Sequence, residues 1–251
     1  MKKLDGKIAI VTGGGKGLGK GITTELLKEG ATVIITGRTL KTLEDTTAEF
    51  KSLGYEVFPI VCDGGDRNQV KNVVKETIGR YSTIDILVNN AQTSKNRVFE
   101  EITDEDMDLA MKSGLMATFY FMQEVFPYIK DKGGKIINFA SGAGIKGMET
   151  QGSYAAAKEG IRGITRVAAR EWGKYGININ IVCPLAETPG MINWKNNYPE
   201  QYEPIVNAIP MRRLGKPEGD IGRTVVFLAS EDSDYITGQT FSVDGGSDLR
   251  P

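Results

Sequence analysis

The chain has 251 residues, and 31 lysines and arginines against 32 aspartates and glutamates leave a formal net charge of −1. This balance gives no electrostatic basis for binding nucleic acid or an anionic membrane, and the length suits one large α/β domain. The complete absence of histidine excludes Ser-His-Asp catalysis, Cys-His pairs and histidine metal sites, and we expect no metal site. Proton transfer near neutral pH must therefore come from Tyr, Lys, Asp, Glu, Cys or the chain termini.

The N-terminal segment and the two cysteines indicate the cytoplasm. The apolar run that begins at Lys7 soon meets glycines and is too short for a signal peptide or a membrane span. Cys62 and Cys183 fall at the ends of predicted strands, where they are expected as small core residues rather than as a disulfide.

The rest of the chain is organised around residues 7–30. Residues 7–12, which after Lys7 are all apolar or β-branched, predict a buried parallel strand. Apolar residues then recur at helical spacing from Leu18. The glycine-rich stretch between strand and helix allows a tight turn, with a pyrophosphate close to the helix N-terminus.

Two nucleotide-binding motifs compete for this turn. Gly14, Gly19 and Lys20 fit the start of a P-loop, but Gly21 follows, so the hydroxyl that would hold a magnesium ion is missing. The letters TGGGKGLG of residues 12–19 fit instead a dinucleotide turn one residue longer than G-x-G-x-x-G. A glycine-rich turn without any ligand is the remaining alternative.

Strand-like and helical runs alternate along the rest of the chain. Further strands are predicted at 32–36, 56–62, 84–89, 135–140, 177–183 and 240–243. Further helices are predicted at 40–53, at 68–80, from 103 onward, at 154–174 and at 217–229. The alternation predicts a single-domain Rossmann-type fold over residues 1–251, with a doubly wound parallel sheet of about seven strands and helices on both faces.

Two of the predicted helices are apolar on more than one side. The helix from 103 carries Met107, Met111 and Met122 on one face, yet Leu109 and Phe119 lie on others. The helix at 154–174 shows the same feature, with small residues that would let another helix approach closely. Because a surface helix normally has one apolar face, we expect a homo-oligomer, with a tetramer as its state.

Tyr154 and Lys158 stand four residues apart, so both side chains leave one face of a helix. An ammonium group near a phenol lowers the pKa of the phenol from about 10 toward the working range. Tyr128 and Lys132 share the spacing, but only Tyr154 has a serine, Ser141, thirteen residues earlier at the end of a predicted strand. In doubly wound sheets the ligand binds at that edge.

Four motifs now follow one another at a characteristic spacing. They are TGGGKGLG at 12–19, Asn-Asn-Ala at 89–91, Ser141, and Tyr154-x-x-x-Lys158. In these motifs the chain resembles the classical short-chain dehydrogenase/reductase family, from residue 6 to about residue 246. The resemblance implies an enzyme that interconverts an alcohol and a ketone with a nicotinamide cofactor.

The same resemblance implies roles for single residues. Tyr154 would be the general acid and base, and Ser141 a hydrogen-bond partner of the substrate oxygen. Lys158 would lower the pKa of Tyr154 and bind the nicotinamide-ribose hydroxyls. Asp63 would meet the adenine amino group, with a local capping role as the alternative. Besides Tyr154 and Lys158, the cofactor site would be lined by Gly13, Gly15, Lys16, Gly17, Leu18, Gly19, Asn89, Ala91, Pro184 and Thr188.

The chain departs from the family pattern at three places. The usual Asn-Asn-Ala-Gly ends in Gln92, and the active-site Asn expected in the long helix is Gly114. After the sixth strand the usual Pro-Gly reads Pro184-Leu185, and the stretch to Thr188 is one residue shorter. A glycine still supplies a backbone carbonyl and permits a local kink, so we expect catalysis to survive.

Several runs narrow the resemblance further. They are AQTSK at 91–95, SGL at 113–115, NFASGAG at 138–144, YAAAKEGIRG at 154–163 and CPLA at 183–186. In these runs the chain is similar to bacterial NADP-dependent 12α-hydroxysteroid dehydrogenases acting on bile acids. This implies reversible oxidation of a steroid secondary alcohol to a ketone.

The residues after the second strand bear on the choice of cofactor. An NAD site needs an acidic residue there to accept from the ribose 2′-hydroxyl, and the corresponding residue is Gly37. Arg38 follows it, and Lys16 lies in the glycine-rich turn. Two cations around a 2′-phosphate favour NADP(H); the alternative is that both are solvated surface charges.

The connection at about 186–214 is long and apolar, and we expect it to be a lid over the substrate. It carries Met191, Ile192, Trp194, Tyr198, Tyr202, Ile205, Ile209 and Met211. That surface suits a bulky apolar substrate, although it would also suit a lid that seals the core or contacts another subunit.

Three functions therefore remain open. The first is an NADP-dependent steroid dehydrogenase, and the second is a reductase of 3-oxoacyl thioesters or of sugar alcohols, of which the apolar lid disfavours sugars. The third is a nucleotide-binding regulator without turnover, for which Gly114 is the only sign.

Overall fold

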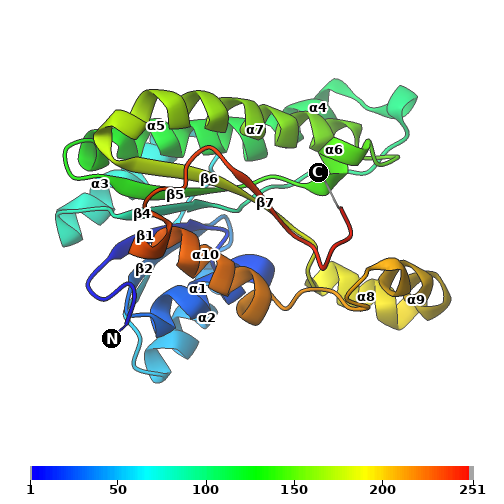
Figure 1. Cartoon of the computed structure of the whole chain (residues 1–251), viewed down its shortest axis with the longest axis horizontal. Helices are drawn as coiled ribbons and strands as arrows, with labels where there is room; N and C mark the ends of the chain where they lie inside the picture. The colour runs from blue at the N-terminus through cyan, green and yellow to red at the C-terminus, as the bar shows by residue number, and fades with distance from the viewer. Residues whose placement is uncertain (1, 249–251) are drawn as a thin grey trace.

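The computed structural model of the chain describes residues 2–248, so residue 1 and residues 249–251 of the predicted domain lie outside the described part. A seven-stranded sheet, parallel throughout, lies at the centre, with the order β3-β2-β1-β4-β5-β6-β7 (Figure 1). The strands are β1 Ile8–Thr12, β2 Thr32–Gly37, β3 Val57–Val61, β4 Ile86–Asn89, β5 Gly134–Phe139, β6 Ile177–Pro184 and β7 Thr240–Val243. The strand order reverses between β1 and β4, which is where doubly wound sheets bind their ligands.

Helices cover both faces of this sheet. Figure 1 shows α1, α2 and α10 on one face and α3, α5 and α7 on the other. The α-helices are α1 Gly17–Lys28, α2 Leu40–Ser52, α3 Arg67–Tyr81, α4 Asp104–Ala110, α5 Ala117–Ile129, α6 Gly142–Lys146, α7 Gly152–Trp172, α8 Pro189–Asn197, α9 Pro199–Ala208 and α10 Arg223–Ala229. The predicted Rossmann-type fold is thereby confirmed.

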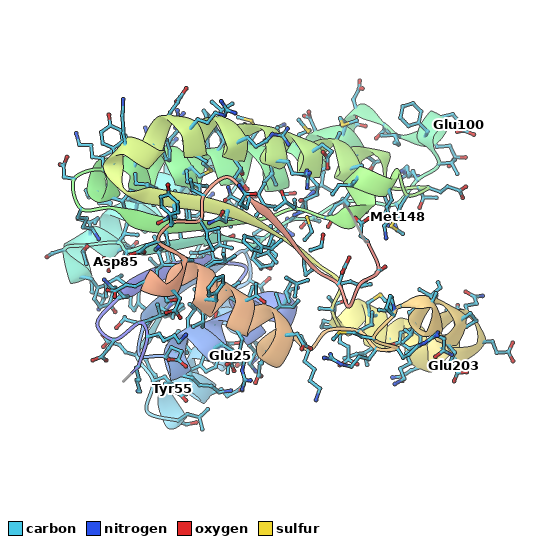
Figure 2. The ribbon with its side chains drawn as sticks, in the orientation of Figure 1. Glu25, Tyr55, Asp85, Glu100, Met148 and Glu203 are labelled. Atoms are coloured by element: carbon cyan, nitrogen blue, oxygen red, sulfur yellow. The ribbon has the colours of Figure 1, made fainter. Side chains whose placement is uncertain are left out.

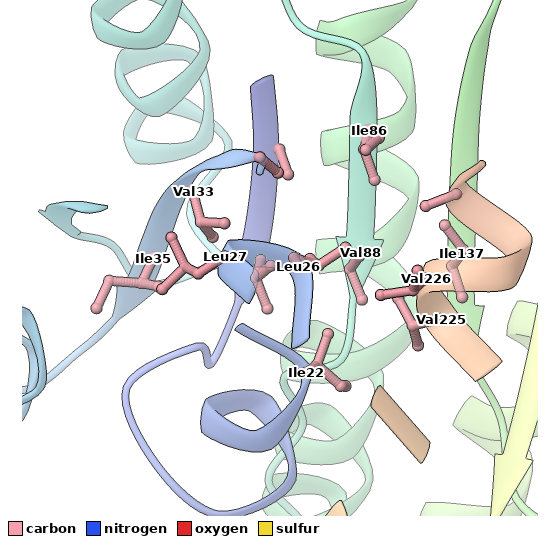
Figure 3. Packing of buried hydrophobic residues seen from close by; sticks show 14 of the residues in the cluster. Ile22, Leu26, Leu27, Val33, Ile35, Ile86, Val88, Ile137, Val225 and Val226 are labelled. Atoms are coloured by element: carbon pink, nitrogen blue, oxygen red, sulfur yellow. The ribbon is translucent and has the colours of Figure 1, made fainter. Parts of the chain in front are cut away.

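Both faces of the sheet are buried because successive strand residues point to opposite sides. Val11 of β1 belongs to one core cluster with Ile22 and Leu26 of α1 and Val225 of α10. Figure 3 shows Ile22, Leu26 and Val225 in this cluster. Ile10, the neighbour of Val11, belongs to the core on the other face. This double burial explains why the strands read as continuous apolar runs.

The long helix predicted from residue 103 is present but not uniform. Thr103 caps it, since the Thr103 hydroxyl accepts from the Asp106 N–H and the Asp106 carboxylate accepts from the Thr103 N–H. Between α4 and α5 one turn, Met111–Met116, is π-helical, and Gly114 lies inside it. At Gly114 the helix therefore departs from α-helical geometry through a wider, π-helical turn.

The predicted lid contains two helices that the sequence analysis did not assign, α8 and α9. They lie to one side of the layered body in Figure 1, and Figure 2 shows Glu203 of α9 at the outer end and Met148 on the body. Among residues 2–248, no helix is long and apolar enough to cross a membrane.

Candidate functional site

The carboxyl ends of the parallel strands share one edge of the sheet and line a cavity of ≈ 550 Å³. Residues from the turn after β1 and from the ends of β2, β3 and β4 meet there. Of the predicted cofactor residues, Gly13, Gly15, Lys16, Gly17, Leu18, Gly19, Arg38, Asp63, Asn89, Ala91 and Thr188 line it. Tyr154, Lys158 and Pro184 do not line it, although Pro184 ends β6 and Tyr154 and Lys158 lie on α7.

The glycine-rich turn shapes the first wall of the cavity. Gly13 and Gly17 have φ angles of +67° and +51°, and a Cβ at Gly19 would lie 2.1 Å from the Gly13 carbonyl oxygen. Lys16, the N-cap of α1, makes no side-chain cap, and the first turn of α1 carries no acidic residue. The N–H groups and the positive dipole end of α1 therefore remain open to the cavity, which fits the pyrophosphate of a dinucleotide.

Hydrogen bonds fasten the loop after β4 to the end of β1. The Thr12 hydroxyl accepts from the backbone N–H groups of Asn90 and Ala91 at 2.9 and 3.0 Å. The Asn90 side chain donates to the Thr12 carbonyl oxygen at 3.0 Å. The two strands that flank the switch point of the sheet are thus held in register at the cavity floor.

A buried polar network, which the sequence analysis missed, joins β4, β5 and α7. The Asn89 amide donates to the Asn138 side-chain oxygen at 2.9 Å, and the Asn138 amide donates to the Thr165 hydroxyl at 2.8 Å. Asn138 and Thr165 are fully buried. Asparagines inside two apolar strands are the sequence signal that would have found it, because buried polar groups need partners.

Ser141, Tyr154 and Lys158 lie together at the ends of β5 and α7. Ser141 follows β5 as the N-cap of α6, and its hydroxyl hydrogen-bonds to the Tyr154 side chain. The Lys158 Nζ is 5.5 Å from the centroid of the Tyr154 ring and donates to the Phe139 carbonyl oxygen at 2.7 Å. The three predicted catalytic side chains are therefore neighbours.

The protonation of this cluster differs from the expectation. Burial raises the pKa of Tyr154 above its usual value, and the hydrogen bond with Ser141 offsets this only in part. Burial also lowers the pKa of Lys158 to about 8. The expectation that the pKa of Tyr154 is lowered is wrong for this structure, because burial outweighs the hydrogen bond from Ser141.

Two cations stand at the outer end of the cavity. Lys16 and Arg38 are exposed, and neither forms an ion pair with a carboxylate among residues 2–248. Arg38 instead donates from Nη2 to the Thr93 hydroxyl at 3.1 Å. Gly37 ends β2 beside them, so no carboxylate is present at that position.

Asp63 and Thr188 each make a local hydrogen bond while lining the cavity. The Asp63 carboxylate accepts from the Gly65 N–H at 3.0 Å within the turn after β3, while Asp66 is the N-cap of α3. The Thr188 hydroxyl caps α8 by accepting from the Met191 N–H at 3.3 Å. Both can still offer hydrogen-bonding capacity to a ligand.

Comparison with known proteins identifies the family. The family model described as Enoyl-(Acyl carrier protein) reductase matches residues 13–248. A 12α-hydroxysteroid dehydrogenase from a Clostridium species is 48% identical, with 100% of both chains covered. The chain belongs to the short-chain dehydrogenase/reductase family.

Other members of the family are similar over the same extent. A 3-oxoacyl-(acyl-carrier-protein) reductase from Thermotoga maritima is 37% identical, covering 97% of this chain and 98% of its own. The crystal structure of a levodione reductase has a TM-score of 0.89 and 32% identity, covering 97% of this chain and 98% of that one. Enzymes of this family use NAD or NADP, and the cavity at the switch point has the features that such a dinucleotide requires.

The lid of this short-chain dehydrogenase/reductase has a small core of its own. Tyr202, Ile209 and Leu214 are buried in it, with Met191 and Trp194 packed against them. The Trp194 and Tyr202 rings meet edge to face at 5.5 Å. Part of the apolar surface predicted for the lid thus seals the lid itself. A second part is exposed, namely Ile192, Tyr198, Ile205 and Met211.

The two cysteines are buried and free, as predicted. Burial raises the pKa of the Cys62 thiol to about 12 and also raises that of Cys183. Neither thiol is therefore activated as a nucleophile.

Proposed function

We propose that the chain is an NADP(H)-dependent dehydrogenase that interconverts a secondary alcohol and a ketone on a bulky apolar substrate, most specifically the 12α-hydroxyl of bile acids. The observation that carries the proposal is the 48% identity with a 12α-hydroxysteroid dehydrogenase over the full length of both chains. The neighbouring Ser141, Tyr154 and Lys158 supply the acid and base that the reaction needs.

In this mechanism the Tyr154 hydroxyl exchanges a proton with the substrate oxygen. Ser141, already hydrogen-bonded to the Tyr154 side chain, orients that oxygen. The buried Lys158 ammonium provides positive charge near the phenol, which stabilises phenolate as it forms. When bound, the nicotinamide cofactor supplies or accepts the hydride.

Lys158 also has hydrogens available for the cofactor. Its ammonium donates to the Phe139 carbonyl oxygen, and an ammonium has three hydrogens to donate. The remaining hydrogens would bind the nicotinamide-ribose hydroxyls, as the family resemblance implies.

Lys16 and Arg38 support a preference for NADP(H). Both line the cavity without a carboxylate partner among residues 2–248, and Gly37 offers none to a ribose hydroxyl. A 2′-phosphate would find two charge-assisted donors, each worth roughly 1.5–3 kcal/mol. Together they would favour NADP(H) over NAD(H) by two or more orders of magnitude.

The exposed apolar side chains of the lid support a bulky apolar substrate. Ile192, Tyr198, Ile205 and Met211 each expose between 49% and 64% of their surface. A steroid beneath the lid would cover such surface and gain hydrophobic free energy. A 3-oxoacyl-thioester reductase is the second candidate, because the relative from Thermotoga maritima carries that activity in its name at 37% identity.

A bile-acid panel with product analysis tests this function. Bile acids with a hydroxyl at position 3, 7 or 12 are offered with NADP, beside an acetoacetyl thioester with NADPH. We expect oxidation only where a 12α-hydroxyl is present. Reduction of the thioester with no steroid turnover would replace the first candidate by the second, and no turnover at all would favour the regulator.

We further propose a homotetramer in the cytoplasm. Leu109, Met116 and Phe119 on the long helix remain partly exposed, and Val167 on α7 exposes 56% of its surface. These apolar faces suit contact with another copy of the chain. Light scattering at micromolar concentration should give four times the mass of one chain, and a stable monomer would refute this.

A further inference from the structure

The side chain of Gln92 lies directly beside Gly114, in the space that a side chain at residue 114 would need. Gln92 stands in the loop after β4, and Gly114 lies in the π-helical turn Met111–Met116. A Cβ built on Gly114 would lie 2.8 Å from both the Cδ and the Oε1 of Gln92, and 3.0 Å from its Nε2. The carboxamide of Gln92 therefore occupies the volume that any side chain at residue 114 would need.

The two positions are also two of the three departures from the family pattern noted in the sequence. The pattern has Gly at residue 92 and Asn at residue 114, whereas this chain has Gln92 and Gly114. Relative to the pattern, a carboxamide is missing at residue 114 and one is present at residue 92, whose side chain lies directly beside the Gly114 backbone.

Neighbouring hydrogen bonds join the backbone beside Gln92 to the turn that contains Gly114. The Thr93 N–H donates to the Ser113 hydroxyl at 3.1 Å, and the Ser113 hydroxyl is 2.8 Å from the Thr93 carbonyl oxygen. The residues that follow Gln92 and precede Gly114 are thereby joined. These bonds fix the backbone on both sides, while the Gln92 side chain itself makes no hydrogen bond within residues 2–248.

The carboxamide itself has no partner within the described chain. Both Nε2 and Oε1 of Gln92 are buried, and neither makes a hydrogen bond to a protein atom of residues 2–248. Buried amides normally find partners, because leaving them unpaired is costly. Gln92, Ala91, Thr93 and Ser113 all line the cavity assigned to the cofactor, so a rotation of the Gln92 side chain toward the cavity would let a bound molecule supply the partner that the protein does not.

We propose that Gln92 is a positioning residue whose carboxamide hydrogen-bonds to the nicotinamide cofactor, and that Gly114 is glycine because this carboxamide fills its place. The inference rests on the cofactor class of the proposed function. It adds a polar contact that the chain's own departures from the family pattern create.

The first test replaces Gln92 by an apolar residue of similar length. Gln92→Met keeps an unbranched side chain against Gly114 and removes both polar atoms. We expect NADPH to bind roughly 3- to 10-fold more weakly, as for the loss of a net hydrogen bond. The Tm of the protein without cofactor should be unchanged or higher, because two unpaired buried atoms are gone.

Calorimetric titration with NADPH and thermal unfolding without it give the two readouts. An unchanged Kd overturns the proposal, since the carboxamide would then not be used. A Tm that falls together with affinity also overturns it, because the role would then be structural. Failure of the unmodified chain to bind NADPH or NADH would instead reject the proposed function.

The second test exchanges the two residues. Gly114→Asn alone should weaken NADPH binding and lower the Tm, because its Cβ meets the Gln92 carboxamide. Gln92→Gly alone should weaken binding by emptying the space. The double variant Gln92→Gly, Gly114→Asn again has one carboxamide there, and we expect its Kd to return to within about threefold of the unmodified value.

A matched control separates this effect from the general effect of replacing a glycine in a helix. Gly79 lies in α3, and a Cβ there would meet nothing within 4 Å. Gly79→Asn should leave NADPH binding unchanged. The proposal fails if the fold-losses of NADPH affinity in the two single variants, at 92 and at 114, simply multiply in the double variant. The two residues would then act independently of each other.

Discussion

The cofactor side of the cleft and the lid are built differently. On the cofactor side, Asn138, Thr165 and Lys158 are buried and every strand is joined to its neighbours by parallel pairing. In the lid, α8 has no buried residue and α9 has one, Tyr202.

The difference separates two tasks. A proton donor and a cofactor must be held to a fraction of an ångström, which a packed sheet edge achieves. A lid with its own small core can change its exposed side chains without disturbing that edge, so substrate choice can vary while the chemistry stays. If the two regions are independent, a substitution in one should leave the function of the other unchanged.

The largest effect is expected at Tyr154. Tyr154→Phe keeps the ring and removes the hydroxyl that donates the proton, so kcat should fall by about 10²–10⁴. Binding of NADPH, measured by calorimetry, should change little, because the rest of the cavity is untouched. Near-normal turnover in this variant would mean that the proton donor is elsewhere.

The chain provides a matched control for this change. Tyr128 also stands four residues before a lysine, Lys132, but it is exposed on α5 and Lys132 pairs with Asp85. Tyr128→Phe should leave kcat and KM as they are. Equal losses in both variants would show that the effect comes from removing a tyrosine hydroxyl anywhere, not from the catalytic site.

The next effect concerns the outer end of the cofactor cavity. Gly37→Asp with Arg38→Leu adds an acceptor for a ribose 2′-hydroxyl and removes a donor for a 2′-phosphate, so the preference should shift from NADP(H) toward NAD(H) by about 10²-fold in kcat/KM. A Cβ at Gly37 meets only Leu43, at an ordinary 3.5 Å, so the change fits. Gly37→Ala is the control and should keep the original preference. Equal use of both cofactors by the unmodified protein would contradict the assignment.

A third effect appears in stability rather than turnover. Burial lowers the pKa of Lys158 from 10.5 to about 8, so the folded state holds its proton less tightly than the unfolded state. Below pH 8 the charged form destabilises the fold by up to about 3 kcal/mol, and stability rises with pH between about 8 and 10.5. Lys158→Met should abolish turnover but raise the free energy of unfolding at pH 7.

Urea unfolding at several pH values measures the free energy of unfolding of Lys158→Met and of the unmodified protein. The gain from Lys158→Met should be largest below pH 8 and should shrink as the pH rises toward 10.5. Loss of the hydrogen bond to the Phe139 carbonyl offsets about 1 kcal/mol of it at every pH. A variant less stable than the unmodified protein at pH 7, or a gain independent of pH, would show that the buried ammonium carries no such cost.

The two regions also differ in how far the sequence could predict them. Strand periodicity, the glycine-rich turn and the Tyr154–Lys158 spacing are local patterns, and the structure places each of them as expected. The network of Asn89, Asn138 and Thr165 joins three elements distant in sequence, so no local pattern contains it.

The match of Gln92 with Gly114 was visible only as two separate departures, because their contact depends on how the loop after β4 meets the long helix. The shift of the Tyr154 pKa was predicted with the wrong sign for a similar reason. Helical spacing places Lys158 near Tyr154 but does not show how deeply the fold buries the phenol, and burial raises its pKa. The lid helices escaped prediction because their apolar residues serve a local core as well as an exposed face.

The smallest effect is expected in the lid, and it tests the independence of the two regions directly. Ile205 exposes 54% of its surface, whereas Tyr202 on the same helix is buried in the lid core. Ile205→Ser removes apolar surface that a steroid would cover, worth about 1 kcal/mol for a partly exposed side chain. The KM for a bile acid should therefore rise about fivefold, while the KM for a small cyclic ketone and the Kd for NADPH stay unchanged.

Tyr202→Ala should instead disrupt the lid and raise the KM for both substrates. If Ile205→Ser affects both substrates equally, the lid is coupled to the cofactor side. If it changes only the mass measured by light scattering, this face of the lid contacts another subunit, and the apolar lid no longer supports a steroid substrate.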